Sequence, residues 1–238
     1  MADTVVGYGM YVDLIRDRIA GKTIISTGMT REVQRVEAAI ETALKGDRVA
    51  LVSSGDPGIY AMAGLVFEML AARGIKVISA LKAAEAPVEQ AFTIEIIPGI
   101  PALCAGAALL GAPLTHDFAV ISLSDLLTPW DVIEKRITAA AEADFVIVIY
   151  NPKSKKRHWQ LDNAQQLILQ HRSGRTPVGV ATKAMRPQEE VTVTTLGALH
   201  RVEVNMQSTV FIGNGTTTRW NEFIYTPRGY GKKYVISS

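Results

Sequence analysis

The sequence contains little cysteine, few aromatic residues and little net charge. Cys104 is its only cysteine, which excludes an internal disulfide and a cysteine-rich metal or iron–sulfur site. The formal net charge is +2 at pH 7, so the chain is not a general polyanion binder and any basic site must be local. Aromatic residues make up 7% of the chain and hydrophobic residues 48%, an aliphatic balance that is typical of α/β proteins.

Long apolar runs and a leader sequence are also missing. No apolar stretch reaches the roughly 20 residues that a membrane-spanning helix needs. The first residues, Met1 to Gly7, lack the basic, apolar and cleavage regions of a secretory signal in series. We therefore expect a cytoplasmic protein.

Several common catalytic motifs do not occur. The four histidines have no metal-ligand spacing, so we predict no metal site. The absence of a P-loop Gly-Lys-Ser/Thr and of a nucleophile elbow removes the nucleotide-triphosphatase and common hydrolase interpretations. Gly7-Tyr8-Gly9 lacks the third glycine of a dinucleotide-binding fingerprint, since position 12 is Val, and is interpreted as a strand end before a helix.

One stretch organises the rest of the chain. Val49 to Val52 is a short β-branched apolar run, typical of a buried parallel strand. Two glycines, a proline and two serines in residues 53–58 then predict a tight loop. Apolar residues at helical spacing from Ile59 to Leu70 predict a helix. Strand, glycine loop and helix in this order place a ligand at the carboxyl end of a parallel sheet.

The remaining patterns predict two α/β domains, residues 1–113 and 114–238. The first sheet is expected to be mainly parallel and the second mixed, because the last strands have no long helix between them. Residues from Ile224 to Ser238 are expected to form a loosely attached tail. Predicted strands cover residues 4–8, 76–79, 93–97, 118–123, 145–150, 177–182, 190–195 and 209–212, and predicted helices cover residues 11–21, 30–45 (capped by Thr30), 102–110, 131–143 and 159–171.

The predicted helix from Ala102 to Leu110 is rich in alanine and glycine. Such a helix allows close approach of a flat ligand or of another backbone, and tight packing on a sheet explains the small residues equally well. Cys104 lies within it and is expected to be a small buried apolar group.

A basic run precedes the predicted helix at residues 159–171. It contains Lys153, Lys155, Lys156, Arg157 and His158. Cations at a helix start oppose the helix macrodipole, which points to a compensating anion; a solvated lysine patch is the alternative. No aromatic residues alternate with these cations, so stacking on nucleobases is not indicated.

Three motifs in order carry a family resemblance. Gly55-Asp56-Pro57, Ile97-Pro98-Gly99-Ile100 and Leu114-Thr115-His116 together resemble the tetrapyrrole (corrin/porphyrin) methylases. Residues 116–136 and 149–154 are similar to those members that methylate C17 of precorrin-3B or cobalt-precorrin-3 in cobalamin (vitamin B12) biosynthesis. The resemblance implies an S-adenosyl-L-methionine-dependent C-methyltransferase, a transfer coupled to ring contraction, a corrinoid substrate and no nucleic-acid or membrane partner.

The resemblance also implies an architecture and a set of site residues. Each of two α/β domains is expected to hold a five-stranded sheet, with the active site in the cleft between them and a homodimer as the assembly. Many relatives carry Ser or Thr where this chain has Pro101, so a hydroxyl contact to the cofactor is missing. The expected cofactor-binding residues are Gly55, Asp56, Ile59, Tyr60, Pro101, Ala102, Asn151, Lys183 and Ala184. Ring contraction needs a positioned acid or base, for which we expect His116, Ser124 and Asp125 as catalytic residues. We expect Lys153, Lys155 and Arg157 to bind the carboxylates of the substrate.

The start of the sequence departs from the family pattern. Relatives begin with an apolar strand and a Gly-x-Gly-Pro-Gly loop, whereas Met1-Ala2-Asp3 stands where the second strand should begin. We expect a truncated chain or a misassigned start codon, because an unpaired strand position in a sheet is costly; another element or a partner filling the gap is the alternative. Two further functions stay open: methylation of RNA or protein on the same fold, and non-catalytic tetrapyrrole binding.

Overall fold

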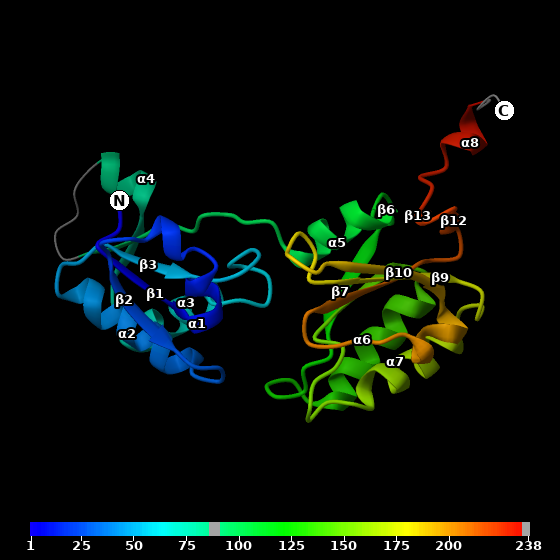
Figure 1. Ribbon diagram of the computed structural model, residues 1–238, viewed down its shortest axis with the longest axis horizontal. Coiled ribbons are helices and arrows are strands. Elements are labelled where there is room, and N and C mark those ends of the chain that lie inside the picture. Colours follow the sequence, from blue (N-terminus) through cyan, green and yellow to red (C-terminus); the bar gives the residue numbers. More distant parts are fainter. Residues whose placement is uncertain (86–90, 235–238) are drawn as a thin grey trace. The chain divides into compact units, whose positions relative to one another are not determined.

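The computed structural model describes residues 1–85 and 91–234. The chain divides into two compact units, Met1–Pro101 and Ala102–Ser238 (Figure 1). This division precedes the boundary expected after Pro113, because helix α5 (Ala102–Leu110) packs on strands of the second unit. A Cβ atom on Gly106 would lie 2.8 Å from the Phe211 ring, so this glycine allows the close approach of helix and sheet.

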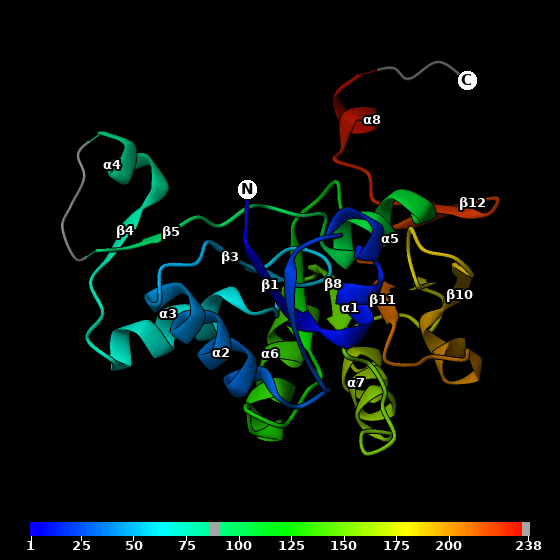
Figure 2. The ribbon, with the colours of Figure 1, turned by 60° about the vertical axis from the view of Figure 1, so that its left-hand side comes forward.

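The first unit contains two small parallel sheets. One has the order β2-β1-β3 and the other pairs β4 with β5, and Figure 2 draws them as separate ribbons. Among the described residues, β3 pairs with a strand on one side alone, so the expected five-stranded sheet is instead divided into three and two strands. The elements are β1 (Thr4–Tyr8), α1 (Gly9–Asp13), η1 (Arg16–Arg18), β2 (Thr23–Thr27), α2 (Glu32–Leu44), β3 (Val49–Val52), α3 (Ala63–Ala72), β4 (Val77–Ser79), α4 (Ala80–Glu85) and β5 (Phe92–Ile94).

Several local predictions in the first unit are wrong. The helix expected over residues 11–21 is divided into the short α1 and η1, and α3 begins at Ala63 and not at Ile59. Helix α2 begins at Glu32, and Thr30 does not cap it: Thr30 has a φ of 59° and its hydroxyl donates to the Met29 carbonyl at 2.6 Å. Strand β2 was not predicted from the sequence, because its side chains are largely exposed and lack the continuous apolar run of a buried strand. The buried Arg35 side chain ties α2 to the end of β2 by donating to the Thr27 hydroxyl.

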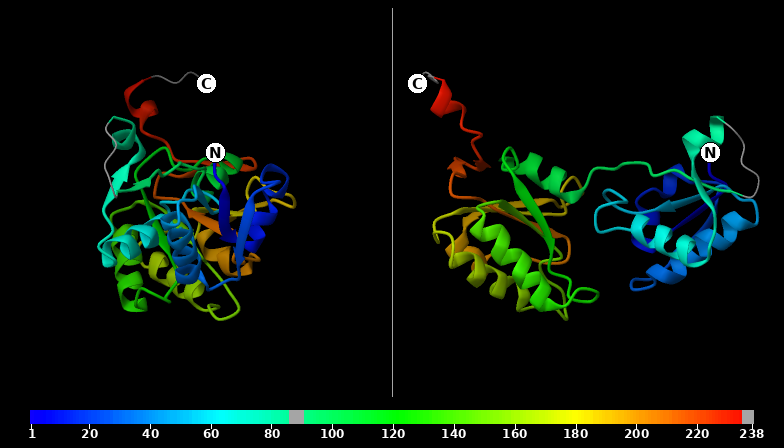
Figure 3. Two further views of the ribbon diagram at one scale, coloured as in Figure 1. Left: turned by 90° about the vertical axis from the view of Figure 1, so that its left-hand side faces the viewer. Right: turned by 180° about the vertical axis from the view of Figure 1, so that it is seen from behind.

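The second unit is built on one mixed sheet of order β10-β9-β11-β8-β7. Helices α6 and α7 cover one face and α5 the other (Figures 1 and 3), so side chains alternate between two apolar layers. The mixed pairing confirms the sequence prediction. The elements are β7 (Phe118–Ser122), α6 (Trp130–Glu142), β8 (Val146–Tyr150), α7 (Gln160–Leu169), β9 (Pro177–Thr182), β10 (Glu190–Thr195), η2 (Leu196–Arg201) and β11 (Ser208–Ile212).

The prediction of a loosely attached tail is wrong for residues 224–226. Strand β13 (Phe223–Tyr225) pairs with β12 (Thr218–Trp220) and β6 (Gly111–Ala112), and α8 (Tyr230–Lys233) follows. The Thr226 hydroxyl is fully buried and donates to the Pro113 carbonyl at 2.7 Å. This segment therefore belongs to the second unit through a hydrogen-bonded sheet, a long-range pairing that has no local sequence pattern.

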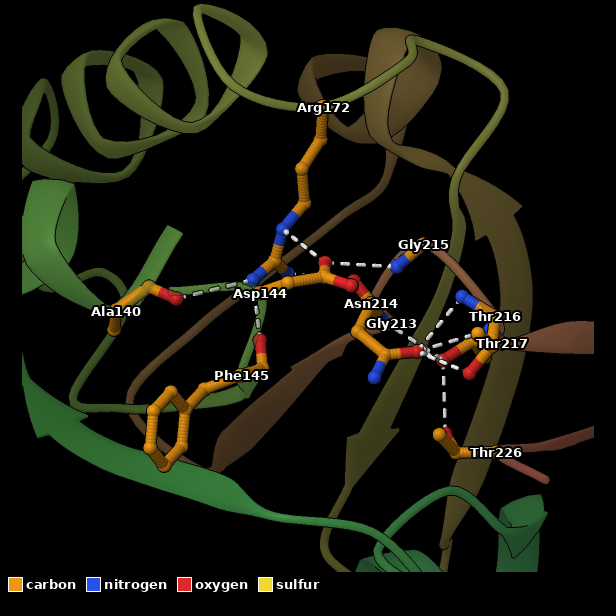
Figure 4. Close-up of polar contacts among 10 residues, drawn as sticks. All are labelled: Ala140, Asp144, Phe145, Arg172, Gly213, Asn214, Gly215, Thr216, Thr217 and Thr226. Carbon is orange, nitrogen blue, oxygen red and sulfur yellow. Dashed lines mark hydrogen bonds and ion pairs between the residues drawn. The ribbon is translucent and has the colours of Figure 1, made fainter. Parts of the chain in front are cut away.

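A buried arginine holds the amino-terminal end of β8 together. Arg172 donates to the carbonyls of Gly213, Ala140 and Phe145 and lies 3.7 Å from the Asp144 carboxylate (Figure 4). Burial lowers the pKa of Arg172, and the Asp144 charge acts in the opposite direction. Within residues 1–85 and 91–234, no helix has the length and apolar character to cross a bilayer.

Candidate functional site

The two glycine loops of the first unit are joined through Asp56. One carboxylate oxygen accepts the Gly58 N–H at 2.8 Å, and the other accepts the Gly99 N–H at 3.0 Å. A Cβ atom on Gly99 would lie 2.1 Å from the Gly55 carbonyl oxygen, and Gly55 has a φ of +77°. Both glycines are therefore required by the contact itself. The contact brings the Ser53–Gly58 loop and the Pro98–Pro101 loop together, two loops that the family resemblance assigns to cofactor binding.

Ile59 and Tyr60 follow directly from this loop. Ile59 is half-buried, whereas the Tyr60 side chain is 54% exposed. Tyr60 has a φ of 50°, a left-handed conformation that costs a non-glycine residue about 1 kcal/mol. Such strain occurs often at ligand sites, and the structure places it on a residue expected to bind the cofactor.

The second unit places most of its predicted residues, though not His116, where strands β7, β8 and β9 end. Strand β7 is parallel to β8, and β8 and β9 are both antiparallel to β11, so the carboxyl ends of β7, β8 and β9 share an edge. Asn151 follows β8 and Lys183 follows β9, and they have φ values of 51° and 53°. The Asn151 amide donates to the Ser122 hydroxyl at 2.9 Å, which links the ends of β8 and β7.

Helix α5 is tied to the same edge. The Tyr150 hydroxyl accepts the Leu103 N–H at 2.8 Å, so Ala102 and the positive end of the helix dipole lie beside the residue that precedes Asn151. The sequence did not indicate Tyr150 or Ser122 as site residues, because a strand pattern does not show which polar group receives a helix N–H.

Lys183 is held by contacts of its backbone and of its side chain. Its N–H donates to the Gln207 carbonyl at 3.0 Å, and its ammonium group donates to the side-chain oxygen of Gln188 at 2.7 Å. The half-buried Ala184 follows it directly. The turn after β9 is therefore fixed by bonds within the second unit.

The three expected catalytic residues do not come together. Ser124 and Asp125 follow β7, where the Asp125 carboxylate accepts from the Gln160 amide at 2.8 Å. His116 precedes the same strand, and its Nδ1 accepts the Asp117 N–H at 2.8 Å. A five-residue strand is about 16 Å long, so β7 holds His116 at the opposite end from the other two.

The basic run divides into exposed and inward-pointing cations. Lys153 and Lys155 are exposed. Arg157 is buried, and its Nε donates to the Asn151 carbonyl at 2.8 Å. Burial lowers the pKa of Arg157, while the Asp125 charge raises it. Arg157 therefore supports the Asn151 backbone, whereas the two lysines remain available to an anion. Cys104 is exposed, which corrects the prediction of a buried thiol.

One hollow of about 300 Å³ lies at the other end of the second unit's sheet. Its lining includes Asp144, Arg172 and Thr217, the region drawn in Figure 4. None of the predicted site residues lines it. Arg172, Asp144 and Thr217 in its lining form hydrogen bonds with neighbouring protein groups. These polar groups therefore stabilise this end of the sheet, and the hollow is not the predicted site.

The family follows from comparison with known proteins. Residues 1–200 match the family model of the tetrapyrrole (corrin/porphyrin) methylases. The chain belongs to this family. It is 48% identical over 236 residues to the cobalt-factor III methyltransferase of Priestia megaterium, covering 99% of this chain but 42% of that protein. It is 49% identical over 229 residues to the probable cobalt-factor III C(17)-methyltransferase of Salmonella typhimurium, covering 96% of this chain and 89% of that one.

Solved structures of methylases share the fold. The structure of the methyltransferase CobJ matches with a TM-score of 0.78 and 36% identity, covering 95% of this chain and 89% of that chain. The structure of the cobalt precorrin-4 methyltransferase CbiF matches with a TM-score of 0.66 at 23% identity, a likeness in fold alone. The chain spans less than half the length of the Priestia relative and most of the length of the Salmonella relative.

Proposed function

We propose that this methylase transfers a methyl group from S-adenosyl-L-methionine to C17 of a cobalt-factor III-type macrocycle in cobalamin biosynthesis. The observation that carries the proposal is the 49% identity to the Salmonella relative, whose name states that activity and most of whose length is covered. Precorrin-3B and cobalt-precorrin-3 are the related macrocycles that the resemblance of residues 116–136 implies, with ring contraction coupled to the transfer.

The residues at the two loop regions fit the proposed cofactor. S-adenosyl-L-methionine supplies an electrophilic methyl group when bound. Asp56 uses one lone pair on each carboxylate oxygen for the loop amides, which leaves acceptor capacity for a ribose hydroxyl or an amino group. Gly55 and Ala102 have little or no side chain, so backbone groups can approach closely. Pro101 has no hydroxyl, so the contact there is apolar.

The remaining proposed cofactor-binding residues follow β8 and β9 in the second unit. Asn151 and Lys183 have left-handed conformations directly after β8 and β9, the kind of backbone strain that is often found at ligand sites. Hydrogen bonds with Ser122, Arg157 and Gln188 hold these two residues in place. A preorganised site of this kind orients the methyl donor and acceptor and excludes water, which is the main demand of a methyl transfer.

Ring contraction additionally needs a group that moves protons. We propose Asp125 or Ser124 for this role, because both follow β7 at the edge where Asn151 lies. His116 stays a prediction, since β7 holds it at the other end of the strand. Lys153 and Lys155 are proposed to bind peripheral carboxylates of the macrocycle, because they are exposed and follow the same edge.

We further propose that the enzyme is a homodimer, as the family resemblance implies. Trp220 and Phe223, on strands β12 and β13, are exposed apolar side chains of the kind that an interface buries. Sedimentation velocity across a concentration series tests this assembly, and a monomer at all concentrations contradicts it.

Mass spectrometry tests the reaction directly. The chain is incubated with S-adenosyl-L-methionine and one macrocycle in each of three reactions. The macrocycles are cobalt-factor III, cobalt-precorrin-3 and precorrin-3B. We expect the gain of one methyl group on a tetrapyrrole. A gain on RNA or protein alone, or tetrapyrrole binding without any methyl gain, contradicts the proposal.

A further inference from the structure

Two neighbouring leucines are presented to solvent after β7. Leu126 is 80% exposed and Leu127 is 94% exposed. Single exposed apolar residues are ordinary, but two large ones in succession on a short loop form a local apolar surface that water solvates poorly. The loop runs from Ser124 to Pro129 and carries both of them at its tip.

Polar and aromatic contacts hold this loop at both ends. At its start, the Ser124 N–H donates to the Ser122 hydroxyl at 3.2 Å, and Asp125 accepts from Gln160. At its end, the Trp130 ring packs edge-on against Trp159 with a centroid separation of 4.9 Å. The leucine pair is therefore held outward by fixed supports.

Exposed cations lie beside the leucines. Strands β7 and β8 pair in parallel, with Ser122 opposite Tyr150, so the loop after β7 and the basic loop after β8 leave the same edge. Figures 1 and 3 draw these green and yellow-green loops side by side. The Asp125–Gln160 bond joins the first loop to the helix that follows the second. The leucine pair thus leaves the sheet at the same end as the exposed Lys153, Lys155 and Lys156.

We propose that Leu126 and Leu127 form an apolar clamp that packs on the face of the tetrapyrrole. The lysines of the neighbouring loop then meet the carboxylates at the rim of the ring. A flat apolar macrocycle with an anionic rim matches both the leucines and the adjacent positive charge, whereas a purely apolar partner leaves the lysines unused. This inference rests on the proposed function and deepens it by naming further substrate-binding residues.

The clamp is tested with matched loop variants. Leu126→Asn combined with Leu127→Asn removes the apolar surface, and Leu126→Met combined with Leu127→Met retains it. Val191→Asn is a control. Val191 is 41% exposed on β10, which is the outermost strand on the side of the sheet opposite β7. Cobalt-factor III and S-adenosylhomocysteine are titrated separately into each variant, methyl transfer is followed, and the sedimentation coefficient is measured.

We expect the asparagine pair to weaken cobalt-factor III binding by about tenfold to a hundredfold, since each leucine loses part of its burial against the ring. Binding of S-adenosylhomocysteine is expected to stay unchanged, and the methionine pair and Val191→Asn are expected to behave like the parent chain. Substitutions at exposed loop positions change stability little, so the unfolding midpoints of the asparagine pair and the methionine pair should agree with that of the parent chain.

The outcomes separate this inference from the proposed function. If the parent chain methylates cobalt-factor III and the asparagine pair binds it equally well, the clamp is refuted while the function stands. If the asparagine pair converts a dimer to a monomer without weakening the binding, the leucines form an interface between copies and the clamp is again refuted. If the parent chain neither binds nor methylates any of the three macrocycles, the proposed function fails, and the clamp with it.

Discussion

The Asp56 carboxylate accepts a hydrogen bond from the backbone N–H of Gly99, 43 positions farther along the sequence, at 3.0 Å. The same carboxylate accepts the Gly58 N–H within its own loop. One side chain therefore sets the distance between two loops that the family resemblance assigns to cofactor binding. Its loss is expected to affect both loops together.

The Asp56 bridge predicts a graded response to substitution. Asp56→Ala removes both acceptors, and we expect about 1–3 kcal/mol of lost stability together with about tenfold weaker binding of S-adenosylhomocysteine. Asp56→Asn keeps one amide oxygen as an acceptor and is expected to have an intermediate effect. Calorimetric titration and chemical unfolding measure the two quantities. Equal binding by all three chains contradicts the role of the bridge.

The contact between Gly99 and Gly55 predicts a position-specific effect of alanine. Gly99→Ala places a Cβ atom 2.1 Å from the Gly55 carbonyl oxygen, so the loops must separate, and we expect about 1–3 kcal/mol of lost stability. Gly64→Ala is the matched control, since Gly64 lies in α3 with nothing within 4 Å of an added Cβ. It is expected to stabilise the chain by about 0.5–1 kcal/mol. Urea unfolding distinguishes the two, and a stabilising Gly99→Ala contradicts the contact.

The cations after β8 predict two separable phenotypes. Arg157→Leu leaves the Asn151 carbonyl without its donor, so we expect about 1–3 kcal/mol of lost stability and weaker binding of both ligands. Lys153→Ala combined with Lys155→Ala is expected to leave stability within about 0.5 kcal/mol of the parent and to weaken tetrapyrrole binding alone. Added salt should reduce the difference in tetrapyrrole affinity between the parent and the lysine variant, because salt screens exposed charges. A lysine variant that is destabilised like Arg157→Leu contradicts this division.

The separation of His116 from Asp125 makes the two candidate proton-transfer residues distinguishable by mutation. Asp125→Asn keeps an oxygen for the Gln160 amide but loses the titratable group, and we expect kcat to fall about a hundredfold. His116→Gln is expected to change kcat by less than about threefold, since the side chain lies at the other end of β7. The pH profile of kcat in each variant is the decisive measurement. If the pH profile of kcat for His116→Gln lacks an ionisation that the parent shows, the acid–base group lies instead at the amino end of β7.

The Asp3–Arg48 pair predicts an acid-dependent contribution to stability. Hydrogen bonds from the Arg48 side chain lower the pKa of Asp3 from 3.8 to about 2. A lowered folded-state pKa means that this contribution is fully present above pH 3.8 and is lost as the pH falls through about 2. Asp3→Asn is therefore expected to be less stable than the parent at neutral pH and to converge with it as the pH falls toward 2. Unfolding free energies measured from neutral pH down to this range check the expectation, and a constant difference contradicts it.

The sequence by itself determined the elements whose apolar pattern is local and continuous. Strands β3, β9 and β10 and helix α5 have the predicted bounds, because each is limited by glycine, proline or polar turn residues that act within a few positions. The Gly55-Asp56-Pro57 and Pro98-Gly99 motifs also marked the two loops that meet in the first unit. These features depend on neighbours along the chain, which a sequence displays.

Tertiary structure alone decided the features that depend on distant partners. Strand β2 is largely exposed, and Ile224 is buried only because β13 pairs with β6 more than a hundred positions earlier. Arg157 turns inward to the Asn151 carbonyl, although Lys156 and His158 on either side of it are exposed. His116 and Asp125 lie close in sequence, yet the rigid strand between them holds them apart. A hydrogen bond or a strand pairing over such separations leaves no periodic signal in the residues that form it, so only the folded chain shows it.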